Sequence, residues 1–214
     1  MSKETSSSRA LVIVLHEIYG VNDHINFFSE ILINGGFDVH IPNLIHRDSF
    51  SYDHEDIAYQ YFMNEIGFEK SLREVEEIIK TNKAEYDQIF IIGFSIGATI
   101  AWMCSEYDIN GVIGYYGSRI RNRKEIEPRC PTLLFFANRE RSFNVMDLEM
   151  DLKKKKNTLI KIIEAEHGFM NPFYRTYDSK EFKNCVEISI EFLKQMQIDK
   201  GNPVKKVSLV REYI

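Results

Sequence analysis

The feature that most constrains this chain is the pentapeptide Gly-Phe-Ser-Ile-Gly at residues 93–97, which follows the short apolar run Ile89 to Ile92. A second apolar run with helical spacing comes next, so the order is strand, tight turn and helix. In such a turn a serine takes a strained backbone conformation that lifts its hydroxyl off the strand end. The two glycines leave room for the strand and the helix to cross. Ser95 is therefore a candidate nucleophile, against the simpler interpretation of a glycine-rich turn with an incidental serine.

Strands and helices are expected to alternate along the whole chain. The expected strands are Ala10–Leu15, Phe37–Ile41, Ile89–Gly93, Gly111–Tyr116, Thr132–Ala137 and Leu159–Ile163. The expected helices run from Asn22 or Asp23 to Gly35, His54–Ile66, Phe68–Asn82, Ile96–Tyr107, Met146–Lys156, and from a Ser179 cap to Met196. This alternation predicts right-handed crossovers and a mainly parallel α/β sheet with helices on both faces.

No repeat or low-complexity linker divides the 214 residues, so a single domain is expected. Residues 1–9 are predicted to be a flexible N-terminus, and residues 199–214 a polar tail with a weak strand-like stretch at Val207 to Val210. The polar N-terminus does not have the pattern of a signal peptide. No apolar run reaches the ~18 residues of a membrane span.

The net charge and the cysteines of the chain argue against some classes of function. The net charge of −5 argues against a nucleic-acid binder, and the basic run Lys153 to Lys156 is interpreted as a solvated helix end. The three cysteines, Cys104, Cys130 and Cys185, form no C-x-x-C pair, which predicts reduced thiols and a cytoplasmic protein. Neither cysteine nor histidine has the spacing of a metal site, so no metal is expected.

Candidate functional groups are expected at the carboxyl ends of the strands, where ligands bind in open α/β sheets. The side chains just past expected strand ends include His16, Glu17, Ser95, Glu140 and His167. Three of them give the chain order serine, acid, histidine. That is the order of the α/β-hydrolase arrangement, and it is more specific than the pentapeptide alone.

The chemistry assigns each group a role. A serine hydroxyl needs a neighbouring base, and His167 can accept its proton and return it to a leaving alkoxide. Glu140 is the predicted carboxylate that orients the ring, although it could be a solvated loop acid. Asp147 is the competing acid, at a position where a helix has begun. The other five histidines precede Ser95, in the wrong order for the base.

Two backbone amides complete the predicted site. The N–H of Ile96 lies at a helix N-terminus and can face a developing oxyanion. The second donor is expected in the loop after the first strand, where Ile18 follows Glu17. Loss of one such donor costs on the order of 3 kcal/mol of transition-state stabilisation.

With these residues placed, the chain resembles the dienelactone hydrolase family of α/β-hydrolases from about Leu11 to Met196. The motifs that carry the resemblance are His-Glu-Ile-Tyr-Gly-Val-Asn at 16–22, the pentapeptide, Tyr-Tyr-Gly at 115–117 and Glu-His-Gly-Phe at 166–169. The resemblance implies a compact hydrolase of small esters or lactones, with no large cap domain and no cofactor. It also implies that Ile18 and Ile96 form the oxyanion hole, and it places Glu17, Tyr116 and Phe169 at the substrate pocket.

Three departures from the family pattern stand out. Ser95 replaces the cysteine of the name-giving members, so Glu17 only needs to shape the site. Glu140 replaces an aspartate and is one methylene longer. Met170-Asn171 stands where members acting on dienelactone carry an arginine. Dienelactone itself is therefore not the expected substrate, and whether Arg175 or one of Arg119 to Arg123 holds a substrate anion stays open.

Three hypotheses follow. The first is a serine hydrolase that forms an acyl-enzyme on Ser95 and acts on a small ester or lactone, without a nucleic-acid or membrane partner. The second is a non-catalytic scaffold that binds a ligand or partner, because a misplaced acid in the loop Asn138 to Arg141 would disable the base. The third is acyl transfer to an acceptor other than water. The sequence does not indicate an oligomeric state.

Overall fold

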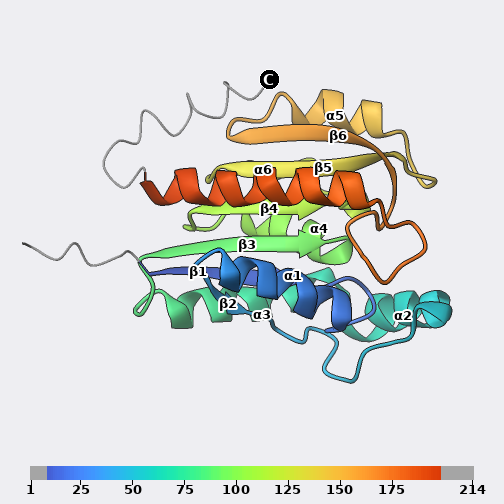
Figure 1. Cartoon of the computed structure of the whole chain (residues 1–214), viewed down its shortest axis with the longest axis horizontal. Coiled ribbons are helices and arrows are strands. Elements are labelled where there is room, and N and C mark those ends of the chain that lie inside the picture. Colours follow the sequence, from blue (N-terminus) through green and yellow to red (C-terminus); the bar gives the residue numbers. More distant parts are fainter. Residues whose placement is uncertain (1–8, 199–214) are drawn as a thin grey trace, which may run out of the picture.

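The computed structural model describes residues 9–198, and its centre is a six-stranded sheet whose neighbouring strands all run parallel (Figure 1). The spatial order is β2–β1–β3–β4–β5–β6. These strands span β1 Ala10–Leu15, β2 Asp38–His40, β3 Gln88–Phe94, β4 Gly111–Tyr115, β5 Thr132–Arg139 and β6 Thr158–Glu166. The predicted parallel α/β sheet is confirmed. The predicted segments 1–8 and 199–214 lie outside the described residues, whereas Arg9 forms ion pairs with Asp38 and Glu85.

Helices cover both faces of the sheet (Figure 1). Val12 and Val14 of β1 point to the face covered by α1 and α6, while Leu11 and Ile13 point to the opposite face. This period of two lets each strand fill two apolar cores at once. The helices of the first face are α1 Asp23–Asn34 and α6 Ser179–Ile198. The helices of the second face are α3 Gly67–Asn82, α4 Ile96–Cys104 and α5 Val145–Leu152.

Two helices end earlier than the sequence pattern predicts. Helix α4 ends at Cys104 instead of residue 107, because the Ser105 hydroxyl donates to the Trp102 carbonyl and satisfies the last turn. Helix α5 ends at Leu152 instead of residue 156, and Asn157, with φ of +61°, turns the chain into β6. The lysines 153–156 therefore follow a helix end, as expected.

The first predicted helix of the 54–82 region is not regular. It begins with a 3₁₀ turn, Tyr52–His54, continues as α2 Glu55–Tyr61, and ends in a π-helical segment, Phe62–Ile66. Gly67, with φ of +74°, then starts α3. The π-helical segment has wider turns than an α-helix, and the 3.6-residue periodicity of the sequence does not reveal it.

The last two strands are longer than predicted, and their length places the site. Strand β5 runs past Ala137 to Arg139, with an irregularity between these residues, and β6 runs to Glu166. Glu140 and His167 therefore follow directly on the final residues of paired neighbouring strands. The carboxyl ends of parallel strands share one edge of the sheet, so the two side chains start close together.

The start of α6 corrects a predicted cap. The Asp178 side chain, not that of Ser179, accepts hydrogen bonds from the amides of Lys180 and Glu181, each at 3.1 Å. We expect Asp178→Ala to lower the free energy of unfolding by about 1 kcal/mol, and Ser179→Ala to change it by only a few tenths. Urea denaturation of both variants checks this. Equal losses would contradict the assignment of the cap.

Candidate active site

The turn between β3 and α4 holds Ser95 in a strained conformation, with φ of +52° and ψ of −110°. A Cβ at Gly93 would lie 2.2 Å from the Gly97 carbonyl oxygen, and one at Gly97 would lie 2.4 Å from that of Leu15. Only glycine fits at both positions, because each contact is with backbone that cannot move aside. The close crossing of β3 and α4 therefore fixes the position of Ser95. The backbone at the end of β1 packs against the start of the same helix. Strain of this kind costs on the order of 1–3 kcal/mol and is typical of functional positions.

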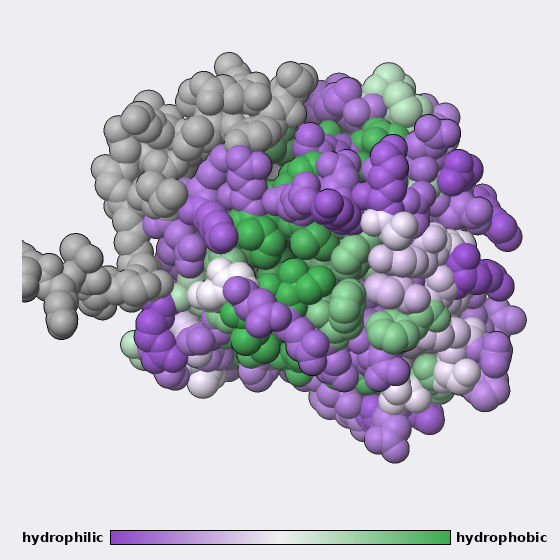
Figure 2. Space-filling model, in the orientation of Figure 1, coloured by the Kyte–Doolittle hydropathy of each residue, from purple (hydrophilic) through white to green (hydrophobic). Residues whose placement is uncertain are grey.

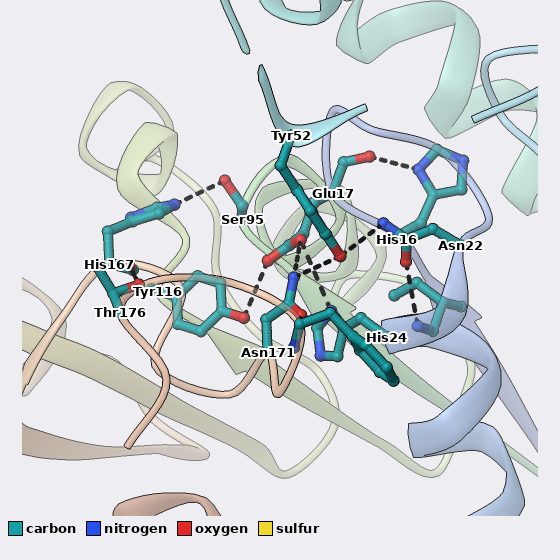
Figure 3. A network of polar contacts seen from close by, with 12 residues as sticks. His16, Glu17, Asn22, His24, Tyr52, Ser95, Tyr116, His167, Asn171 and Thr176 are labelled. Atoms are coloured by element: carbon teal, nitrogen blue, oxygen red, sulfur yellow. Dashed lines mark hydrogen bonds and ion pairs between the residues drawn. The ribbon is translucent and has the colours of Figure 1, made fainter. Parts of the chain in front are cut away.

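The structure brings Ser95, His167 and Glu140 into one hydrogen-bonded chain. His167 Nε2 lies 3.0 Å from Ser95 Oγ (Figure 3), and His167 Nδ1 lies 2.7 Å from Glu140 Oε1. A carboxylate can only accept, so Nδ1 carries the proton and Nε2 is free to accept from the serine hydroxyl. The Glu140 side chain is 4% exposed and that of His167 is 38% exposed. The acid is therefore buried, whereas part of the His167 side chain is accessible to solvent.

The surroundings of His167 favour its protonated form. Partial burial lowers the pKa, but the hydrogen bond and charge of Glu140, with the charges of Glu17 and Glu55, outweigh it and raise the pKa above its ordinary value. The Thr176 hydroxyl donates to the His167 carbonyl oxygen at 2.6 Å and holds the loop. An imidazolium formed at this position is therefore stabilised.

Asp147, the alternative acid, lies elsewhere. It is exposed in the first turn of α5 and is not on the wall of the cavity beside Ser95. Glu140, despite its extra methylene, reaches the imidazole. The geometry therefore favours Glu140 of the two acids.

A cavity of about 350 Å³ opens over Ser95 and His167. Its lining residues include Ile18 and Ile96, which carry the two candidate amide donors, and Glu17. Several other lining residues were not anticipated as part of the site: Tyr19, Glu55, Tyr59, Arg139, Arg141, Glu166 and Tyr174. They come from loops, from α2 and from the last residues of β5 and β6, and only the tertiary fold assembles them.

Five arginines line this cavity. Arg175 lies 3.9 Å from Glu55, and Arg141 lies 3.6 Å from Glu166, so each is close to an acid. The remaining three are Arg119, Arg121 and Arg139.

Two of these arginines lie on the turn after β4. Arg119 donates to the Tyr59 hydroxyl, and Arg121 donates to a backbone carbonyl and lies over the Phe143 ring. Partial burial and the charge of Arg119 lower the pKa of Arg121. Arg123 pairs with Glu69 and does not line the cavity.

Glu17 lies on the cavity wall within a buried polar network (Figure 3). The Tyr116 hydroxyl donates to Glu17 Oε1 at 3.0 Å, the Asn171 amide donates to Oε2 at 3.4 Å, and His24 Nδ1 lies 3.6 Å from Oε2. Burial raises the pKa of Glu17, but the contacts with His24 and Tyr116 and the charge of His167 together hold it below its ordinary value. Asn171, at the place where an arginine is typical of dienelactone-cleaving members, therefore serves this network.

Tyr116 and Phe169 do not lie on the wall, where the sequence placed them. Both are fully buried, with ring centroids 5.5 Å apart, and the Tyr116 ring lies 4.8 Å from that of His167. Tyr116 has φ of +43°, a conformation that the sequence does not reveal. The Tyr116 ring therefore packs against the imidazole, and Phe169 packs against Tyr116.

The amides of Ile18 and Ile96 are both free to act as donors. Within residues 9–198, neither N–H donates to a backbone or side-chain acceptor. Both residues line the cavity together with Ser95. Unpaired backbone donors beside a nucleophile are the kind of group that can stabilise an oxyanion.

The described residues form neither a membrane-spanning helix nor a cluster of metal ligands. None of the helices combines the length and apolar content that crossing a membrane requires. Within residues 9–198, no group of three or more His, Cys, Asp or Glu side chains is placed to hold a metal ion.

An open parallel sheet with a strained serine, an acid and a histidine, in that chain order, at the carboxyl ends of its strands defines an α/β-hydrolase. The solved structures that are similar agree. A Klebsiella pneumoniae protein assigned as a dienelactone hydrolase has a TM-score of 0.75 at 18% identity, with 90% of each chain covered. A dienelactone hydrolase-like promiscuous phosphotriesterase from metagenomic libraries has a TM-score of 0.69 at 15% identity, covering 91% of this chain and 89% of that one. At such identities the likeness concerns the fold.

Residues 1–197 match the model of the dienelactone hydrolase family. The chain belongs to this family, and its class is that of the hydrolases. It is also 37% identical over 206 residues to the uncharacterized protein YczH of Bacillus subtilis, an alignment that covers 94% of this chain and 96% of that protein. The resemblance expected from the motifs is confirmed at the level of the family.

Proposed function

We propose that this protein is a serine hydrolase that cleaves an ester or lactone bond of a small substrate through an acyl-enzyme on Ser95. The observation that carries the proposal is the unbroken path from Ser95 Oγ through His167 to Glu140, with bonds of 3.0 and 2.7 Å. Membership of the dienelactone hydrolase family supports the reaction class. No cofactor is needed for this chemistry.

Acylation uses each member of the path once. Ser95 Oγ attacks the carbonyl carbon as His167 Nε2 takes the hydroxyl proton, and the carbonyl oxygen becomes an oxyanion facing the amides of Ile18 and Ile96. Glu140 stabilises the imidazolium that forms. The intermediate collapses, the bond to the leaving oxygen breaks, and His167 returns the proton to the departing alkoxide.

Deacylation repeats these steps with water. His167 removes a proton from a water molecule as its oxygen attacks the acyl carbon, and the same two amides face the second oxyanion. Ser95 leaves as an alkoxide and recovers its proton from His167, which releases the acid. An acceptor alcohol in place of water would give acyl transfer with the same residues, so the acyltransferase hypothesis differs only in the acceptor.

The arginines that line the cavity indicate which substrates it would prefer. Arg119 and Arg121 lie together on one wall, and within the described residues no ion pair links either guanidinium to an acid. These guanidinium groups therefore support a preference for substrates with negative charge near the ester. Arg175, the other candidate, lies beside Glu55 and is less available.

A fluorophosphonate probe tests the proposal directly. We expect it to label the full chain once, at Ser95, and p-nitrophenyl acetate to compete with the labelling while being hydrolysed. The scaffold hypothesis predicts a folded protein with neither labelling nor turnover. Its motivation, a misplaced acid, is not supported by the 2.7 Å contact between Glu140 and His167.

A further inference from the structure

The loop after β1 contains a buried histidine that the mechanism above does not use. His16 is fully buried, and its ring bridges two backbone segments. His16 Nε2 lies 3.0 Å from the amide nitrogen of Leu44, and Nδ1 lies 2.6 Å from the carbonyl oxygen of Glu17 (Figure 3). The ring therefore joins the oxyanion-side loop to the segment after β2.

The two contacts fix one tautomer of the ring. The Leu44 N–H can only donate, so Nε2 must be the unprotonated acceptor. Nδ1 therefore carries the proton and donates it to the Glu17 carbonyl. Burial lowers the pKa of His16 to about 4, so the ring stays neutral at neutral pH. His16 thus acts as a fixed donor, not as a titrating group.

The Glu17 carbonyl and the Ile18 N–H belong to the same peptide unit. In a planar trans peptide these two bonds point in opposite directions. The Glu17 carbonyl oxygen accepts from His16 at 2.6 Å and from the Gly20 amide at 3.2 Å, so its direction is set twice. The Ile18 N–H then points away from His16, and within residues 9–198 it has no acceptor, although Ile18 lines the cavity with Ser95.

The same loop also packs against the start of α4, next to the nucleophile. The carbonyl oxygens of Leu15 and His16 would lie 2.4 and 2.6 Å from a Cβ at Gly97, so the loop backbone rests on the start of α4. Gly20, with φ of +86°, closes the turn. These contacts restrict any shift of the loop as a whole. The motion that they leave possible is a rotation of the peptide unit between Glu17 and Ile18.

We propose that His16 is a positioning residue, which aims the Ile18 amide at the oxyanion by holding the carbonyl oxygen of Glu17. The inference rests on the proposed function, since an oxyanion must form for the amide to matter. The Ile18 amide would bind the oxyanion, which forms in the transition state and not in the bound substrate. Loss of His16 should therefore lower kcat and leave KM almost unchanged.

Three variants of the full chain test this. His16→Phe keeps a ring and removes both hydrogen bonds. His16→Asn can place its amide N–H where Nδ1 lies and keep the donation to Glu17, whereas the longer side chain of His16→Gln places its amide where Nε2 lies, beside Leu44. With p-nitrophenyl acetate we expect His16→Phe and His16→Gln to lower kcat about 10- to 100-fold and to change KM less than about threefold. The Ki of a trifluoromethyl ketone, which forms an oxyanion on the serine, should rise by a similar factor. His16→Asn should recover most of the loss.

Folding is checked by circular dichroism and thermal melting, and His16→Gln decides if His16→Phe does not fold. A folded His16→Phe or His16→Gln with wild-type kcat and Ki, a loss confined to KM, or an Asn variant as poor as Gln would each overturn the role of His16. Those results leave the hydrolase proposal intact when the wild type is active. A wild type that neither turns over ester nor takes the fluorophosphonate would instead remove the proposed function, and this inference with it.

Discussion

Ser95→Ala is expected to lower kcat/KM for p-nitrophenyl acetate by about 10⁴- to 10⁶-fold, because removal of the nucleophile leaves only binding and oxyanion stabilisation. The hydroxyl that lies 3.0 Å from His167 Nε2 is the group that would attack. The variant should fold normally, since alanine in place of serine adds no atoms to the turn. Steady-state hydrolysis at pH 8 measures the effect.

Ser179→Ala is the matched control for this variant. Ser179 lies at the exposed start of α6 and is absent from the cavity wall, so its loss should leave kcat/KM within about twofold of wild type. If Ser95→Ala retained more than about a tenth of the wild-type rate, hydrolysis would have to proceed through another nucleophile.

Glu140→Gln is expected to lower kcat by about 10³- to 10⁴-fold. The amide of glutamine can donate toward Nδ1 and favour the wrong tautomer of His167, in which Nε2 carries the proton and cannot accept one from Ser95. Glu140→Asp keeps the charge with a side chain one methylene shorter, so it should lose less activity than Glu140→Gln. A Glu140→Gln rate within about tenfold of wild type would point to a different acid.

The pH profile gives this variant a second readout. The base must be neutral, and Glu140 raises the pKa of His167, so wild-type kcat/KM should fall as pH drops through a value above the ordinary histidine value of about 6.5. Removing the charge and the hydrogen bond lowers that pKa. The acid limb of Glu140→Gln should therefore move to lower pH, and an unchanged limb would contradict the contact.

The meeting of Ser95, His167 and Glu140 could be anticipated, because the fold puts the carboxyl ends of parallel strands on one edge. Apolar runs of strand length located those ends to within a few residues. What the sequence could not show was the length of β5 and β6, which decides how directly Glu140 and His167 follow their strands. That depends on pairing between neighbours, which local periodicity does not contain.

The cavity walls were harder to anticipate. Tyr59 and Glu55 come from α2, whose helical pattern gives no sign that it borders Ser95. Tyr116 was expected on the wall, but its positive φ accompanies a fully buried ring behind His167. Hydrophobic spacing tells which face of an element is buried. It does not tell which distant segment covers that face.

The cap of α6 and the network around Glu17 illustrate the same limit at shorter range. Asp178 and Ser179 are adjacent and are both good cap residues, and only the backbone conformation decides between them. Asn171 stands near the position at which dienelactone-cleaving members carry an arginine, and in the fold its amide donates to Glu17 and to the Tyr52 hydroxyl. A residue type that breaks a family pattern can therefore signal a different local partner.

The most direct test of the central claim is to trap the covalent intermediate. The full chain is mixed with p-nitrophenyl acetate, quenched in acid within the first turnover, digested and analysed by mass spectrometry. The account predicts a single acetyl group on the peptide that contains Ser95, formed at the rate of the nitrophenol burst and absent from Ser95→Ala. Full turnover with no acetyl group on Ser95, or with the acetyl group on another residue, would contradict it.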